Sequence, residues 1–342
     1  MLSSSFTAVI PVHNRADLLE RLLATVRKQT VAFNEIVVVD NASTDGAREV
    51  ARAFGCRVIE MGENAGFARA VNRGWRAAGS EWVAILNSDI ELDSRWLEHL
   101  ISGSLTTGSL TTGSLKTGSP EASFATGTIV SAANHEIVDG TYDLVSRAGC
   151  AWRAGHGEPA PDGGYGSYPI AIAPGTACLY RRSVLDQLGG FDERYVSYLE
   201  DVDLGLRCLR EGFMGVYVSN AIAYHHGSAS FGRWNPRVVR LISRNQVMLV
   251  SRHYDPALFR SCFRAILAGQ LLWGLVALRH GRPLAWIAGK VEGLRGFHLE
   301  GTPSPRLREF LAASENEIRR RATGSYWRWY FRLTRFQSTG AQ

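Results

Sequence analysis

The fold is decided by the stretch Glu35-Ile-Val-Val-Val-Asp40, whose β-branched residues predict a buried strand that stops at an aspartate. Before it, the apolar run from Phe6 to Pro11 predicts another strand, and Arg15 to Gln29 has the apolar spacing of an amphipathic helix. The same patterns predict helices at Ala47 to Phe54 and Gly66 to Ala78, and strands at Arg57 to Met61, Trp82 to Leu86, Phe124 to Val130 and Ile170 to Ala173.

Polar residues follow three of these predicted strands. Strands and helices that alternate at this spacing predict an α/β fold, with parallel strands joined by right-handed crossovers. In such sheets, ligands bind beyond the carboxyl ends of the strands. Those ends carry His13-Asn14-Arg15, Asp40-Asn41 and Asn87-Ser88-Asp89. We therefore expect a binding site at this edge of the sheet.

A second group of acidic residues begins a predicted helix at Glu200-Asp201-Val202-Asp203. Acidic residues favour the positive end of the helix dipole, which accounts for one carboxylate in a first turn. Three carboxylates close to an aromatic pair also suggest a chemical role.

At this point the chain resembles the family 2 inverting glycosyltransferases of the GT-A fold, and within them the bacterial rhamnosyltransferase-like branch. The resemblance covers residues 6–230. It implies a central, mostly parallel sheet with helices on both faces. Its motifs are Pro11-Val-His-Asn-Arg15, Val38-Val-Asp40-Asn-Ala-Ser-Thr-Asp45-Gly46, Asn64-Ala-Gly66-Phe-Ala68, Asn72, Asn87-Ser-Asp89, Pro174-Gly-Thr-Ala177, Gly190-Phe-Asp-Glu193, Glu200-Asp-Val-Asp-Leu204 and His225-His-Gly-Ser-Ala-Ser230.

The resemblance implies a role for each group of residues. Asp201 is the general base and Glu200 orients it or contacts the acceptor, while Asp89 and His225 hold Mg²⁺ or Mn²⁺ against the donor diphosphate. Asp40 contacts the nucleobase, although a turn-initiating aspartate explains it equally well. Asn87 departs from the family's D-x-D motif and leaves Asp89 as the one firm carboxylate. The nucleotide-sugar site further includes Pro11, His13, Arg15, Asn41, Asn64, Gly66, Ala68, Asn72, Asn87 and Ser88.

The implied function is inverting transfer of one sugar from a nucleotide-sugar donor to a hydroxyl group of a saccharide or lipid-linked saccharide, in envelope polysaccharide synthesis. dTDP-rhamnose is the leading donor, followed by UDP-galactofuranose, UDP-hexoses and GDP-sugars. A sugar nucleotidyltransferase is disfavoured because no glycine follows the first strand. A processive synthase is disfavoured because the Q-x-x-R-W element is incomplete, with Arg233-Trp234 present but Ser at position 230, and because no segment is expected to span a membrane.

The C-terminal part of the chain is basic. From Phe231 onward it has 19 Lys and Arg against 6 Asp and Glu, although the whole chain carries only +6. This balance suggests a polyanionic partner. The apolar run from Ala265 to Leu278 is shorter than the about 20 residues that a spanning helix needs. It predicts either a helix lying in the membrane surface or a buried helix, with equal weight.

Arg319-Arg-Arg321 and the aromatic cluster from Tyr326 to Tyr330 could bind single-stranded nucleic acid or the lipid headgroup region. We favour peripheral contact with an anionic membrane over nucleic acid, because a lipid-linked acceptor would be presented there. The oligomeric state stays open.

Composition bears on location and domains. Five widely spaced cysteines without a C-x-x-C pair suit a reducing cytoplasm, and no secretion signal is evident at the N-terminus. The expected location is cytoplasmic, at the inner face of the cell membrane. We expect a catalytic domain at 1–230 and a basic helical region at 231–342. The GSLTT repeats at 103–119 predict a mobile loop.

Overall fold

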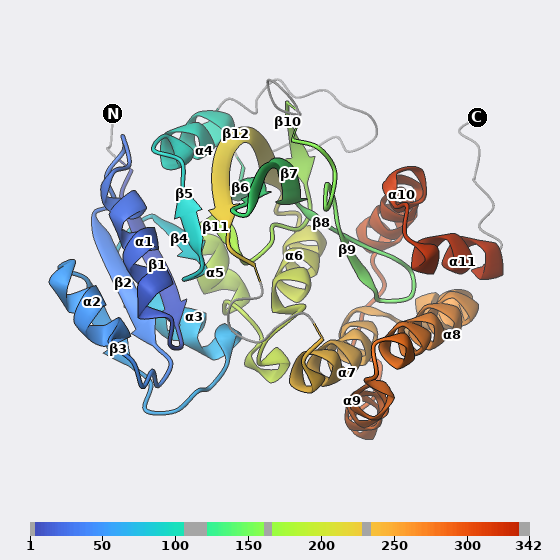
Figure 1. The fold of residues 1–342 in the computed structure, drawn as a ribbon. Coiled ribbons are helices and arrows are strands. Elements are labelled where there is room, and N and C mark those ends of the chain that lie inside the picture. Colours follow the sequence, from blue (N-terminus) through green and yellow to red (C-terminus); the bar gives the residue numbers. More distant parts are fainter. Residues whose placement is uncertain (1–3, 106–121, 161–165, 228–233, 335–342) are drawn as a thin grey trace. The chain divides into compact units, whose positions relative to one another are not determined.

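The computed structural model describes residues 4–105, 122–160, 166–227 and 234–334 (Figure 1). The chain divides into two compact units. Unit 1 comprises residues 1–142 and 155–230, and unit 2 comprises residues 143–154 and 231–342. The segment 143–154, which the sequence analysis placed inside the catalytic domain, therefore belongs to the C-terminal unit.

Unit 1 is built on a ten-stranded mixed sheet whose main path runs β10-β12-β6-β11-β4-β1-β2-β3. The strands β3, β2, β1 and β4 are parallel, as the sequence pattern predicts. Their bounds are β1 Phe6–Val12, β2 Glu35–Asp40, β3 Arg57–Glu60 and β4 Trp82–Leu86. The intervening helices are α1 Ala16–Arg27, α2 Ala47–Ala53 and α3 Phe67–Ala77.

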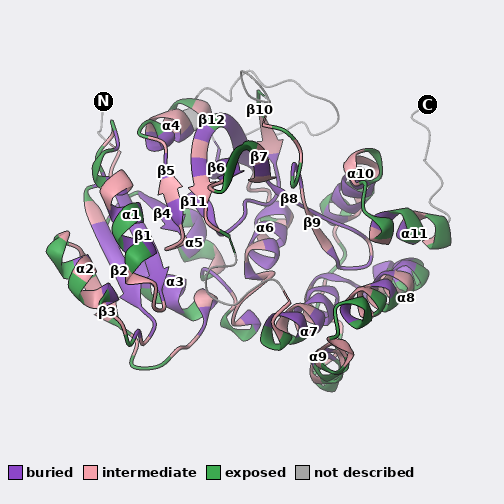
Figure 2. Cartoon of the chain, viewed as in Figure 1, coloured by how far each residue is buried: buried purple, intermediate pink, exposed green. Residues whose placement is uncertain are grey.

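Both faces of these strands are covered by helices. Side chains alternate along β1, so Ala8 and Ile10 join the core formed with α1, α2 and α4, while Val9 faces α3. Gly74 of α3 is required for this close packing, because an added Cβ would lie 2.3 Å from Val9 Cγ1. The strands β1 and β4 are buried over their whole length (Figure 2). The core thus holds the carboxyl ends of the strands in fixed positions.

The later strands give the sheet its mixed character. β11 lies antiparallel between β4 and β6, and β12 runs parallel to β6. The remaining bounds in unit 1 are β5 Ile90–Leu92, α4 Trp96–Leu105, β6 Phe124–Ser131, β7 Asn134–Gly140, β10 Ser167–Ile170, β11 Ala177–Arg181, α5 Arg182–Leu188, the 3₁₀ helix Glu193–Tyr195, α6 Glu200–Glu211 and β12 Gly215–His225.

Two sequence expectations change here. The strand predicted at Ile170–Ala173 instead ends at Ile170, and the following residues lead into β11. The first residues of the expected repeat loop, 103–105, complete α4, where Gly103 contacts Val218 closely. The rest of the repeat, 106–119, lies outside the described residues.

The described residues of unit 2 form five helices and a hairpin. They are α7 Pro236–His253, α8 Pro256–Arg279, α9 Pro283–Arg295, α10 Pro305–Arg321, α11 Ser325–Thr334, β8 Asp143–Val145 and β9 Ala151–Arg153. The hairpin is anchored by α10, whose Ser314 Oγ and Glu315 Oε1 accept the N–H groups of Val145 and Arg147, each at 2.8 Å. Gly289 and Gly293 allow α9 to pack closely on α7.

The apolar segment is longer than the sequence analysis expected. α8 has 24 residues because Arg260 and Arg264 lie on its exposed face and do not end it. Within the described residues, α8 alone is long and apolar enough to cross a membrane, and 28% of its most apolar window is buried. Helix length and composition are weak grounds for a span, since core helices share them.

The C-terminal aromatic cluster points largely into unit 2. Trp327 and Tyr330 are buried, Tyr330 donates its hydroxyl hydrogen to Glu315, and Tyr326 donates to Gly269 O at 3.1 Å. Trp329 is exposed. The buried rings of Trp327 and Tyr330 cannot stack on bases, which leaves Trp329 as the exposed tryptophan of the cluster.

Candidate active site

The loops that follow β1 and β2 are joined by hydrogen bonds at the carboxyl edge of the sheet. The N–H of Asn14 donates to Ser43 Oγ at 2.9 Å, and Asn14 Oδ1 accepts the N–H of Thr44 at 2.8 Å. His13 contacts the Asn41 carbonyl through Nδ1 at 2.9 Å, so Nδ1 must carry the proton. His13 therefore shapes the rim.

Asp40 ends β2 and is buried at 1% exposure. Its Oδ1 accepts the N–H of Ser43 at 3.0 Å, and its Oδ2 lies 3.7 Å from Arg48 Nε. Asp40 thus accepts a hydrogen bond from the backbone three residues later, as a turn-initiating aspartate does. Both carboxylate oxygens therefore already have partners within unit 1.

The loop at residues 64–66 is held by Asn41. Asn41 Nδ2 donates to Asn64 Oδ1 at 3.1 Å and to the Gly66 carbonyl, while its Oδ1 accepts the N–H of Ala65. The buried amide of Asn41 is therefore committed to the loop. Asn64 and Gly66 are brought to the same edge as the ends of β1 and β2.

Gly66 connects this loop to the segment that precedes α6. It has φ 88° and ψ 172°, and an added Cβ would lie 2.5 Å from Val196 Cγ1 and 2.6 Å from the Val196 carbonyl oxygen. The N–H groups of Ala68 and Phe67 donate to Val196 O and Ser197 Oγ. The two segments are therefore packed backbone against backbone.

Strained backbone marks the same region independently. Among the described residues, those other than glycine with positive φ all lie in three short segments of the rim: Asn14, Arg15, Ala42, Val196, Tyr198 and Leu199. Such conformations are costly, above all for a β-branched residue such as Val196, and they concentrate at functional sites. No residue pattern in this part of the chain predicts the strain.

Asp201 lies in the first turn of α6, directly after the strained segment. Its Oδ1 accepts the N–H of Val202 at 2.8 Å and its Oδ2 accepts the N–H of Gly175 at 2.9 Å. Two backbone N–H donors therefore fix the orientation of this carboxylate. Glu200 precedes it and is buried.

The segment around Gly175 also reaches the loop of Asp89. The N–H of Asn87 donates to the Thr176 carbonyl at 2.9 Å, while Gly175 next to it holds Asp201. Asn87, Ser88 and Asp89 are partly exposed in this loop. Hydrogen bonds thus join the predicted metal side of the site to the predicted base.

Asp89 and His225 meet because β5 pairs with β12. In this register Ile90 lies opposite His225, and the N–H of His226 donates to the Asp89 carbonyl at 2.9 Å. His225 Nε2 lies 3.5 Å from Asp89 Oδ1. The hydrogen bond that Arg15 donates to Asp17 is the largest cause of the raised pKa of Arg15, and the charge of Asp89 contributes to the same shift. The ends of β1, β4 and β12 are therefore electrostatically connected.

The structure adds Asp139, which the sequence analysis missed. Its Oδ2 lies 2.7 Å from His225 Nδ1, on the opposite side of the imidazole from Asp89. Burial alone would lower the pKa of His225, but hydrogen bonds to both carboxylates and their charges raise it to about 9. His226 Nε2 is paired separately with Glu91 at 2.8 Å.

Three residues predicted to contact the donor are instead buried within unit 1. Pro11 lies inside β1, and Ala68 packs against the Val196 segment. The amide of Asn72 is fully used, because it donates to the Phe191 carbonyl and Glu193 and accepts from Phe191 N–H and Trp75 Nε1. The structure gives these three residues a packing role.

A divalent cation suits the residues at this edge. Asp89 and His225 offer one carboxylate oxygen and one imidazole nitrogen, and both side chains are mostly buried. No cluster of three or more His, Cys, Asp and Glu side chains suitable for a metal occurs within the described ranges. Such a pair fits an ion that takes its other ligands from a diphosphate and water, as Mg²⁺ commonly does.

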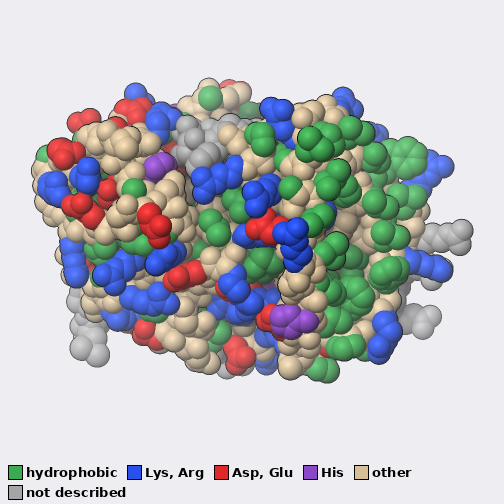
Figure 3. Space-filling model, turned by 90° about the horizontal axis from the view of Figure 1, so that it is seen from below, with side chains coloured by type: hydrophobic (Ala, Val, Ile, Leu, Met, Phe, Trp, Pro, Cys, Tyr) green, Lys and Arg blue, Asp and Glu red, His purple; other side chains and the backbone are tan. Residues whose placement is uncertain are grey.

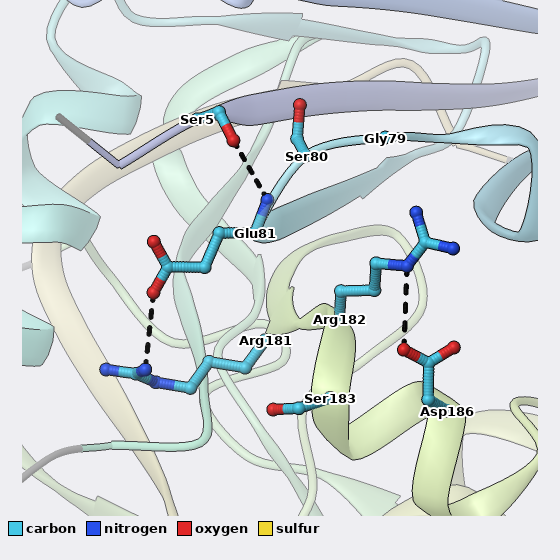
Figure 4. A pocket seen from close by; sticks show the side chains of 8 residues that line it. All are labelled: Ser5, Gly79, Ser80, Glu81, Arg181, Arg182, Ser183 and Asp186. Carbon is cyan, nitrogen blue, oxygen red and sulfur yellow. Dashed lines mark hydrogen bonds and ion pairs between the residues drawn. The ribbon is translucent and has the colours of Figure 1, made fainter. Parts of the chain in front are cut away.

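A hollow of about 560 Å³ lies at the other edge of the sheet (Figure 4). It is lined by residues just before β1 and β4 and just after β11, including Ser5, Glu81 and Arg181. Glu81 pairs with Arg181 at 3.4 Å, and Arg182 pairs with Asp186 at 3.5 Å. None of the predicted site residues lines it.

Comparison with known proteins gives consistent matches. The model of glycosyl transferase family 2 matches residues 7–189, and that of glycosyl transferase family 21 matches residues 167–288. An N-acetylglucosaminyl-diphospho-decaprenol L-rhamnosyltransferase of Mycobacterium tuberculosis is 29% identical over 249 residues, which cover 66% of this chain and 79% of that protein.

Two solved structures share the fold. GalNAc-T7 with UDP, GalNAc and Mn²⁺ has a TM-score of 0.60 at 15% identity, covering 79% of this chain and 51% of that one. The mannosyltransferase PcManGT of Pyrobaculum calidifontis, in complex with GDP-Man and Mn²⁺, has a TM-score of 0.52 at 16% identity, covering 97% and 84%.

Proposed function

Because the chain belongs to glycosyl transferase family 2, we propose that it passes one sugar from a nucleotide-sugar donor to a hydroxyl group of a lipid-linked saccharide, with inversion at the anomeric carbon. The observation that carries this proposal is the position of Asp201, whose two oxygens are held by backbone N–H groups. Asp201 is linked through Gly175 and Thr176 to the loop that presents Asp89.

Asp201 acts as the general base. The acceptor oxygen attacks the anomeric carbon while the bond from that carbon to the donor's diphosphate oxygen breaks, and the acceptor proton passes to the Asp201 carboxylate. A single displacement of this kind inverts the centre and forms no covalent enzyme intermediate.

Asp89 and His225 are the residues proposed to hold Mg²⁺ or Mn²⁺. When bound, the ion supplies neutralisation of the charge that develops on the leaving diphosphate. The partly exposed guanidinium of Arg15 adds a positive charge at the same rim. Asn41 and Asn64 maintain the loop against which the nucleotide would lie.

The relative from M. tuberculosis supports the choice of substrates. Its name describes L-rhamnose transfer to a decaprenol-linked saccharide. We propose dTDP-rhamnose as donor and a polyprenyl-diphosphate-linked saccharide as acceptor, in envelope polysaccharide synthesis. UDP-galactofuranose, UDP-hexoses and GDP-sugars are the alternative donors.

The proposal is tested by thermal melting with dTDP, UDP and GDP, each with and without Mn²⁺, followed by transfer assays with the matching sugar nucleotides. A ligand at 100 times its Kd stabilises a protein by about 2.7 kcal/mol. We expect metal-dependent stabilisation by dTDP that Asp89→Ala loses and Asp201→Asn keeps. Product NMR should show the inverted anomer.

A control variant isolates the base. Glu211→Gln removes a carboxylate at the other end of α6, so it should keep the wild-type kcat, whereas Asp201→Asn should lower kcat by about 10²-fold or more. Stabilisation by no nucleotide would contradict the transferase proposal. Stabilisation by UDP or GDP alone would mean that the donor is a UDP- or GDP-sugar, while the proposed inverting transfer would stand.

We also propose that unit 2 contacts an anionic membrane. Among the described residues, every large hydrophobic side chain that is exposed lies on α8, α9 or α11. They are Phe263, Leu267, Leu271, Leu275, Leu278, Leu284, Ile287, Val291, Leu294, Trp329 and Leu333. Toward the right of Figure 3, hydrophobic side chains gather in this way, with Lys and Arg among and beside them.

α8 has one buried face and one exposed face. Leu258, Cys262 and Ala265 point into unit 2, whereas Leu267, Leu271 and Leu275 are more than half exposed. One side of the helix is therefore core, and the other side is exposed and is the side we propose to contact the membrane. Exposed Arg260, Arg264 and Arg279 bracket the apolar stripe, as expected of an interfacial helix on anionic lipid.

Vesicle flotation tests this contact. Wild-type protein should float with phosphatidylglycerol vesicles, Leu271→Glu should weaken binding, and Ser261→Glu, which adds the same charge outside the stripe, should not. Failure of the wild-type protein to float, together with concentration-dependent dimers in light scattering, would assign the face to a second copy of the chain.

A further inference from the structure

His225 is held from both sides by carboxylates. Nδ1 lies 2.7 Å from Asp139 Oδ2, and Nε2 lies 3.5 Å from Asp89 Oδ1. A neutral imidazole whose Nδ1–H donates to a carboxylate keeps its Nε2 lone pair available. In the neutral form of His225 that binds a cation, the available nitrogen therefore faces Asp89.

Asp139 reaches this position because of an irregularity in β7. Along the β6–β7 ladder, Ile129 pairs with Gly140 while Val130 pairs with Val138, so Asp139 is an extra residue on β7. Such bulges re-aim a side chain and are enriched beside active sites. The Asp139 carbonyl is additionally contacted by His156 Nδ1 at 2.9 Å, which holds the bulge.

The parallel pairing of β6 with β12 completes the arrangement. Ser131 lies opposite His225 and Val130 opposite Tyr224. β6 therefore lies between the bulged strand and the strand that carries the histidine. The contact between Asp139 and His225 is set by two adjacent ladders rather than by loop geometry.

We propose that Asp139 is a positioning residue, which fixes the tautomer and ring orientation of His225 so that Nε2 serves as a ligand to a divalent cation shared with Asp89. The inference rests on the proposed function, because it requires the nucleotide-bound cation. A carboxylate behind a metal-binding histidine is a general means of orienting the ring, and its loss costs about 10- to 100-fold in metal affinity or activity.

The test is an EPR titration of Mn²⁺ into the full chain with saturating dTDP, repeated with UDP. Asp139→Ala should weaken Mn²⁺ binding about 10- to 100-fold, and Asp139→Asn, which keeps an acceptor for Nδ1–H, should weaken it less. Glu136→Ala removes an exposed carboxylate from the same strand and should bind Mn²⁺ as the wild type does.

A double-mutant cycle distinguishes positioning from a general structural role. If Asp139 acts through His225, adding Asp139→Asn to His225→Gln should cause no further loss of Mn²⁺ affinity. Additive losses, or wild-type affinity in both Asp139 variants, would overturn the inference and leave the proposed metal site intact. Failure of the wild-type protein to bind Mn²⁺ with either nucleotide would overturn both.

Discussion

Replacing Gly66 by alanine should damage stability and catalysis together. Its φ of 88° and ψ of 172° lie in a region open to almost no residue except glycine, which costs about 1–3 kcal/mol for a side-chain-bearing residue. The new methyl group would also lie 2.5 Å from Val196 Cγ1 and 2.6 Å from the Val196 carbonyl. Overpacking of this kind adds about 1–3 kcal/mol.

The expected loss in the free energy of unfolding is therefore about 2–6 kcal/mol, measured by urea denaturation. Val196 lies five residues before Asp201, so relief of the clash should displace the proposed base. We expect kcat for sugar transfer to fall more than the affinity for the nucleotide. The reason is that the proposed nucleotide contacts lie at the ends of β1, β2 and β4 and not in the Val196 segment.

Gly62 provides the matched control. It also has positive φ, 75°, but an added Cβ would meet nothing within 4 Å. Gly62→Ala should therefore cost only the backbone strain of about 1–2 kcal/mol and preserve kcat. Equal losses of stability in the two variants, with unchanged kcat in Gly66→Ala, would refute the reasoning.

Three further predictions concern buried charges. The two carboxylate partners of His225 raise its pKa to about 9. Protonated His225 therefore stabilises the fold fully below about pH 6.5, and this stabilisation is lost as the pH rises through 9. In urea denaturation, the free energy of unfolding of the metal-free wild-type protein, relative to His225→Gln, should fall by about 3 kcal/mol between pH 6 and 10. Burial lowers the pKa of Lys290 to about 8, so between pH 8 and 10.5 the unfolded chain holds a proton on Lys290 that the folded chain has released. Over that range the free energy of unfolding of the wild-type protein, relative to Lys290→Met, should rise by about 3 kcal/mol. Arg147 pairs with the fully buried Glu315 at 2.7 Å, so Arg147→Met should cost about 3–5 kcal/mol, and the double variant with Glu315→Met should recover most of it.

The parts of the site that local sequence could predict are those at the ends of regular elements. Asp40, Asp89 and Asp201 follow apolar strands or begin an amphipathic helix, and all three lie where those patterns predict. Local pattern also gives the parallel half of the sheet, because each β-α-β unit spans a short stretch of chain.

The missed features depend on contacts between distant segments. Asp139 became visible only through a bulge in the β6–β7 ladder and the neighbouring β6–β12 pairing. The amide of Asn72 is used by residues about 120 positions away, which no periodicity reveals. The length of α8 was underestimated because Arg260 and Arg264 interrupt the apolar run without interrupting the helix.

The hairpin at residues 143–154 has a consequence for synthesis on the ribosome. Arg147 and its partner Glu315 are separated by 168 residues, and chains grow at about 5–20 residues per second. After it is synthesised, the hairpin therefore lacks its partner α10 for on the order of ten seconds. During this time Leu144, Val145 and Cys150, which are buried in the folded protein, stay uncovered. During that interval the nascent chain offers an apolar surface to chaperones, and a chain released early, after residue 230, would keep that surface permanently exposed.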